Sequence, residues 1–172
     1  MWEIYASGLA RWLHFLFGIM WIGLLYFFNF VNVEATKQAN AAGEGAPFGK
    51  YMMPRALWFF RWGAVATWVV GALLLAFELP DVNGLNGFLA SFGLQGGDAP
   101  IGIGAWLGTI MLINVWTFIW MNQKKILGMV PATDEQKVKA RRVAFLASRV
   151  NTMLSIPMLF FMVTGPHQSI FH

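Results

Sequence analysis

The sequence predicts an all-α membrane protein, a four-helix transmembrane bundle with both termini on the outer (periplasmic) side. Composition, the length of the apolar segments and the placement of basic residues lead to this prediction. Of the 172 residues, 58% are hydrophobic and only 12% are charged, whereas soluble domains carry roughly 25% charged residues. The chain is therefore expected to lie in a lipid bilayer.

Four apolar segments are each long enough to cross a bilayer, which takes about 20 helical residues. Because lipid offers no hydrogen bonds to the backbone, segments of this length span as helices. We expect a single membrane domain, residues 1–172, with no second domain. The expected spans are about residues 9–33, 56–79, 101–121 and 143–164.

A short helix is expected in the second connection, over about residues 84–93. Leu85, Phe88, Leu89 and Phe92 recur there at helical spacing and form one apolar face. An amphipathic segment beside a membrane span is typical of a helix that lies in the interface.

Lysine and arginine in the short connections predict the orientation. The second connection has acidic residues and no basic residue, whereas the first and third connections are basic. The basic connections should face the cytoplasm, as in a multi-pass protein of the bacterial inner membrane, and this topology explains the basic pI without a nucleic-acid partner. The basic residues are Lys37, Lys50 and Arg55 in the first connection and Lys124, Lys125, Lys137, Lys139, Arg141 and Arg142 in the third.

Few residues inside the spans can carry chemistry. The apolar segments, the second of which ends at Phe77, contain no Asp or Glu, so neither a carboxylate relay nor a di-iron bundle is expected. The chain has no cysteine, which excludes thiolate metal sites and covalent haem attachment through C-x-x-C-H. Any cofactor would be held without covalent bonds.

His14 is the main candidate functional residue, because a polar side chain in an apolar span needs a partner. On a helix it shares one stripe with Arg11, Gly18 and Trp21. Gly18 would leave a flat space beside the imidazole for a planar macrocycle, and Arg11 could pair with a propionate. The stripe is consistent with haem b, whose iron takes histidine as an axial ligand.

The second axial ligand stays open at this stage. His167 and Met162 are the candidates, and a five-coordinate iron with His14 alone is the third possibility. The competing interpretation of the stripe is structural, with His14 bonded to a neighbouring helix and Gly18 allowing close packing. Five polar residues are also expected to pair helix to helix, namely Asn114, Asn122, Asn151, Thr152 and Ser155.

Four stretches, one per span, resemble the N-terminal membrane domain of bacterial membrane-bound urate hydroxylases, the urate oxidase N-terminal family. They are RWLHFLFGIMWIG (11–23), WFFRWGAVATWVVG (58–71), NVWTFIWMNQKK (114–125) and NTMLSIPMLFFMVTGPH (151–167). The first stretch also resembles the four-helix protoporphyrinogen oxidases and the D-type copper-resistance membrane proteins. In the oxidases the matching histidine is a haem ligand, so the resemblance implies this role for His14.

The resemblance implies an electron-transfer protein that works with a membrane-protein or cytochrome partner. The second span departs from the family pattern, which has His and Glu where this chain has Trp58, Arg61 and Gly63. We therefore expect the fold and the haem site to be kept, but not urate hydroxylation. Three alternatives remain, namely a cofactor-free accessory subunit of a larger membrane complex, a haem-dependent protoporphyrinogen oxidase and, least expected, urate oxidation.

Overall fold

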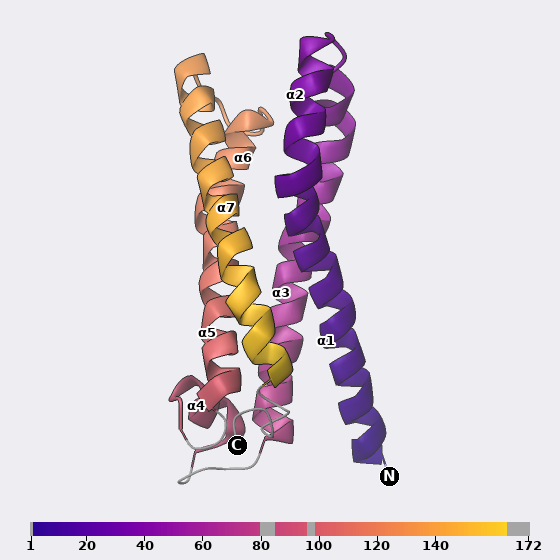
Figure 1. Ribbon diagram of the computed structural model, residues 1–172, viewed down its shortest axis with the longest axis vertical. Coiled ribbons are helices and arrows are strands. Elements are labelled where there is room, and N and C mark those ends of the chain that lie inside the picture. The colour runs from indigo at the N-terminus through magenta and orange to yellow at the C-terminus, as the bar shows by residue number, and fades with distance from the viewer. Residues whose placement is uncertain (1, 80–84, 96–98, 165–172) are drawn as a thin grey trace.

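The fold is a bundle of four long helical runs (Figure 1). The computed structural model describes residues 2–79, 85–95 and 99–164. Within these residues four runs are long and apolar enough to cross a membrane, which confirms the predicted all-α class and four-helix transmembrane bundle. The runs cover Tyr5–Ala41, Phe48–Phe77, Ala99–Ile126 and Asp134–Thr164.

Three of the runs contain a short π-helical segment, in which the backbone bonds reach one residue further than in an α-helix. The elements of the first two runs are α1 (Trp2–Tyr26), η1 (Phe27–Asn32), α2 (Val33–Ala41), η2 (Phe48–Met52) and α3 (Met53–Glu78). The later elements are α4 (Gly87–Phe92), α5 (Ala99–Asn114), η4 (Val115–Trp120), α6 (Met121–Ile126) and α7 (Asp134–Thr164).

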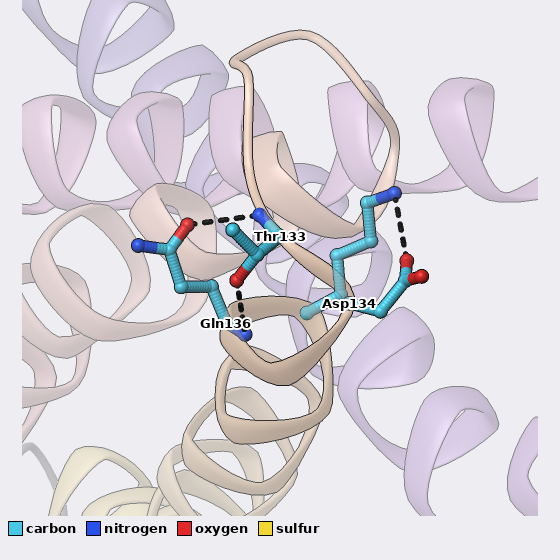
Figure 2. Close-up of polar contacts among 4 residues, drawn as sticks. Thr133, Asp134 and Gln136 are labelled. Carbon is cyan, nitrogen blue, oxygen red and sulfur yellow. Dashed lines mark hydrogen bonds and ion pairs between the residues drawn. The ribbon is translucent and has the colours of Figure 1, made fainter.

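The helix α7 begins well before the apolar segment expected at about residue 143. Thr133 and Gln136 form a reciprocal cap, since the Thr133 backbone N–H donates to Gln136 Oε1 at 3.0 Å and the Gln136 N–H donates to Thr133 Oγ1 at 3.2 Å (Figure 2). Such a capping box satisfies backbone donors that the first helical turn leaves free. Asp134 and Glu135 in that turn complement the positive end of the helix dipole.

The helices pack mainly as two pairs, α1 with α3 and α5 with α7 (Figure 1). A cluster of buried apolar side chains joins the two pairs in the middle of the bundle. Its members are Trp21, Ile22, Leu25, Phe28, Leu57, Phe60, Ala64, Met111, Val115, Ile119 and Met158.

Hydrogen bonds between side chains and backbone fasten α7 to α5. Asn151 is fully buried, and its amide donates to the Met111 carbonyl at 3.0 Å. The Asn114 amide donates to Asn151 Oδ1 at 2.7 Å and to the Ala147 carbonyl at 2.8 Å. Because these groups would otherwise lie in an apolar interior without partners, the network fixes how α5 and α7 meet.

Two further bonds join α7 to the first run. Asn29 in η1 donates to Ser148 Oγ at 2.7 Å, and the Tyr26 and Ser155 hydroxyls lie 3.0 Å apart. Of the five residues expected to pair helix to helix, Asn114, Asn151 and Ser155 therefore do so. Asn122 and Thr152 instead bond carbonyls one turn earlier in their own helices.

The basic connections gather at one end of the bundle. In Figure 1, α2, α6 and the start of α7 lie at the top, whereas the start of α1, the end of α7 and α4 lie at the bottom. This arrangement agrees with the grouping from which the orientation was predicted. The side of the membrane on which the termini lie stays a prediction.

The helix α4 lies within the predicted range 84–93, of which residue 84 is outside the described residues. Its small residues Gly87, Ala90 and Ser91 are buried, whereas Leu89 is 51% exposed. A Cβ at Gly87 would collide with the Leu75 carbonyl. Small residues therefore let α4 pack closely on α3, and its place in the membrane interface stays a prediction.

We predict that Asn151→Ala lowers the free energy of unfolding by about 1–2 kcal/mol, because the Met111 carbonyl and the Asn114 amide each lose a buried partner. Unfolding in mixed detergent–SDS micelles, followed by tryptophan fluorescence, measures this change. Asn122→Ala is the matched control, since the Asn122 amide donates to the Phe118 carbonyl one turn earlier in the same helical run. If Asn122→Ala lowers the free energy of unfolding as much as Asn151→Ala does, the hydrogen bonds of Asn151 do not stabilise the contact between α5 and α7.

Candidate functional site

The stripe that contains His14 passes from the surface into the core of the bundle. Arg11 is exposed, His14 and Gly18 are partly buried, and Trp21 is only 2% exposed. The stripe therefore faces α3 and the bundle interior, and His14 occupies the boundary between its exposed and buried parts.

The His14 ring bonds α3 across the helix interface. Its Nδ1 lies 3.0 Å from the Thr67 carbonyl oxygen. Because a carbonyl oxygen can only accept, the bond requires the proton on Nδ1. In the neutral ring, Nε2 then carries a lone pair that can bind a metal or accept a proton.

Gly71 gives the His14 ring access to the Thr67 carbonyl. A Cβ at Gly71 would lie 2.7 Å from His14 Cε1, closer than real Cβ atoms approach, and 3.0 Å from Nδ1. The Thr67 side chain is occupied elsewhere, since its hydroxyl donates to the Gly63 carbonyl at 2.7 Å. The imidazole therefore fits because residue 71 has no side chain.

Sequence reasoning missed Thr67 and Gly71 as partners of His14. The signal was present, because Gly63, Thr67 and Gly71 form a small-x-x-x-small series along α3. Such a series marks the face on which a neighbouring transmembrane helix approaches closely.

Gly18 also faces α3. A Cβ at Gly18 would have Thr67 Cγ2 as its neighbour at 3.8 Å, which is ordinary van der Waals contact. The structure therefore places this glycine at a helix–helix contact, as the structural interpretation of the stripe expected.

Trp21 carries a buried donor without an acceptor. Its Nε1 has no hydrogen-bond partner in the described part of the chain, although the side chain lies in the central cluster. An unpaired buried donor costs free energy. Trp21 is thus able to donate to a polar group that enters the bundle about 10 Å along α1 from His14, at 1.5 Å per residue.

The structure does not bring Met162 to His14. Met162 packs against Gly104 of α5, where a Cβ would lie 3.3 Å from its Cγ and Cε atoms, whereas His14 contacts α3. The last turn of α7 is also separate from α1 in Figure 1. His167, the other candidate ligand, lies outside the described residues.

Two shallow apolar grooves mark the surface of the bundle, and neither includes a residue of the predicted haem set. One, of about 500 Å³, lies between the third and fourth runs beside Asn114. The other, of about 680 Å³, lies between α1 and α3 beside Met20 and Trp62. Among the described residues, no group of three or more His, Asp or Glu could hold a metal ion. A metal at this site would therefore depend on His14.

We predict that Gly71→Ala lowers the free energy of unfolding by about 1–3 kcal/mol, because the new methyl group displaces the His14 ring. Gly18→Ala is the matched control, for which we expect no loss or a gain of up to about 1 kcal/mol from helix propensity. Unfolding in detergent–SDS mixtures measures both changes in the free energy of unfolding. An equal change in the free energy of unfolding in Gly71→Ala and Gly18→Ala would show that Gly71 does not make room for His14.

Comparison with protein families identifies a match in the second half of the chain. The profile described as urate oxidase N-terminal matches residues 85–172, just over half of the chain. The match includes the stretches 114–125 and 151–167, whereas 11–23 and 58–71 lie outside it. Comparisons with curated proteins and with solved structures give no match. Together with the four membrane-spanning helices, the match shows that the chain belongs to the urate oxidase N-terminal family and forms a membrane domain.

Proposed function

We propose that this membrane domain binds haem b and transfers electrons, with His14 as an axial ligand of the iron. One observation carries the proposal, the hydrogen bond from His14 Nδ1 to the Thr67 carbonyl. Histidines that bind metals almost always donate their other ring N–H to such an acceptor, which fixes the ring and leaves Nε2 for the metal. Haem b bound there would supply a one-electron couple between ferric and ferrous iron.

Other residues of the His14 stripe would contact the haem. Arg11, one turn toward the start of α1, would pair with a propionate. Trp21 would lie at the inner end of the site, where its unpaired Nε1 offers a donor, whereas Gly18 is already in contact with Thr67 of α3. Since Met162 packs against Gly104, we favour His167 or an open position over Met162 as the second ligand.

The proposed setting is the bacterial inner membrane, with both termini on the outer side. Its support is the gathering of the basic connections at one end of the bundle, since such connections stay in the cytoplasm. The stripe then lies in the outer half of the membrane. The proposed partner is a membrane protein or a cytochrome that exchanges electrons at that face.

We predict that the detergent-purified protein shows a Soret band that shifts on reduction and is lost in His14→Ala. Gly71→Ala should weaken the band, because it displaces the ring that binds iron. His167→Ala tests the second ligand, and we expect a changed spectrum with haem retained. A colourless protein that also fails to take up added haem would rule out the proposal.

The orientation has its own test, which uses the absence of native cysteine. In intact spheroplasts, a membrane-impermeant maleimide should label Tyr5→Cys, at the start of the first run, and leave Met129→Cys unlabelled until the membrane is opened. Both positions are more than half exposed, at 68% and 57%. The reverse labelling pattern would place the termini in the cytoplasm.

A cofactor-free accessory subunit is the second candidate function. The observation that favours it is that the contacts of His14 with Thr67 and Gly71 already form a complete helix–helix contact. This alternative predicts a colourless chain that copurifies with a larger membrane complex. The visible spectrum therefore separates the two functions.

A further inference from the structure

Arg61 is a charged residue for which the proposed haem function has no use. It lies in α3, about 7 Å along the helix from Ala56 at 1.5 Å per residue, and so within the second apolar segment. Charged residues in membrane spans are rare, and they mostly pair with other groups or mark a binding site. We therefore expect the charged guanidinium of Arg61 to interact with another group.

The guanidinium of Arg61 lies over an indole of another run. Its Cζ atom is 3.7 Å from the ring centroid of Trp120 in η4. The indole face stabilises the cation, but the contact uses only one face of the guanidinium. The five N–H donors lie in the plane of the group and remain suited to a fork-shaped acceptor such as phosphate.

The described part of the chain supplies no acceptor for the Nε of Arg61, which is buried without a hydrogen-bond partner there. Arg61 as a whole residue is partly exposed, which is consistent with access from outside the protein.

We propose that Arg61 and Trp120 form a binding site for the phosphate of an anionic phospholipid, in the leaflet next to the basic end of the bundle. Lys124 follows Trp120 by one helical turn on the same face, about 6 Å closer to that end. It adds a second positive charge on the side from which a headgroup would approach. Basic sites between transmembrane helices suit such headgroups.

A lipid fits this site better than free phosphate does. Arg61 lies inside the apolar segment, where a free anion would have to leave water, whereas a lipid phosphate is held at the edge of the hydrocarbon by its own acyl chains. The rings of Trp62 and Trp116 meet edge to face 5.5 Å apart on the same two runs, and Trp62 is 45% exposed. They offer apolar surface to an acyl chain beside the headgroup.

Arg149 provides a matched control. It lies about 9 Å along α7 from Val143, and so at a similar depth in its own segment. Its Cζ is 5.1 Å from the ring centroid of Phe145, a residue of the same helix. Arg149 therefore has the same charge without the indole contact between two runs.

Native mass spectrometry of the purified protein with an equimolar mixture of phosphatidylglycerol and phosphatidylcholine tests the site. We expect the wild type to retain one phosphatidylglycerol molecule in preference to phosphatidylcholine. Arg61→Gln should weaken that binding about tenfold, since a charge-assisted contact is lost, while Arg149→Gln should change it less than about twofold. The binding of phosphatidylglycerol to Arg61→Lys should be intermediate, because lysine keeps the positive charge but lacks the planar, forked arrangement of N–H donors.

Three results would overturn the proposal: equal retention of the two lipids, equal losses in Arg61→Gln and Arg149→Gln, or displacement of the lipid by inorganic phosphate at equal concentration. If Arg61→Gln does not fold, Trp120→Leu and Arg61→Lys take its place. Weaker phosphatidylglycerol binding in both then supports the site, and unchanged binding in both overturns it.

Discussion

The membrane-spanning parts of the four helical runs lie in a medium that offers no hydrogen bonds, so polar groups inside the bundle depend on partners within the chain. This constraint explains where the polar residues lie. Asn151 bonds the Met111 carbonyl and Asn114 at the contact between α5 and α7, and His14 bonds the Thr67 carbonyl at the contact between α1 and α3. Each bond fixes one of the two helix pairs.

Under the same constraint, a buried polar group without a partner in the chain is a candidate contact for a ligand. Trp21 Nε1 and Arg61 Nε are two of the buried side-chain atoms without a hydrogen-bond partner in the described residues; the others are Asn29 Oδ1, Ser91 Oγ and Trp116 Nε1. Trp21 and Arg61 lie in different parts of the bundle, Trp21 on the stripe of His14 and Arg61 beside Trp120 near the basic end. The haem proposal uses Trp21, and the lipid proposal uses Arg61. The two proposals are independent, because they rest on separate residues and separate measurements.

The sequence was sufficient to predict the all-α fold class and the four-helix membrane bundle, because the length of an apolar segment is a property of local sequence. The stripe of His14 was also predictable from helical periodicity, and the match over residues 85–172 supports the family that the four stretches suggested. The partner of His14 was not predicted, since a carbonyl of another helix carries no side-chain signal and becomes reachable only because position 71 is glycine. The packing of Met162 against Gly104 depends in the same way on how two helices meet.

The central claim is that His14 holds its proton on Nδ1 and leaves Nε2 free for iron. Long-range ¹H–¹⁵N correlation spectra of protein labelled at histidine nitrogen, with the His14 signals assigned by His14→Gln, test it most directly. The account predicts a protonated Nδ1 and a bare Nε2 before haem is added, and paramagnetic loss of the His14 signals afterwards. A proton on Nε2, or His14 signals that added haem leaves unchanged, would contradict it.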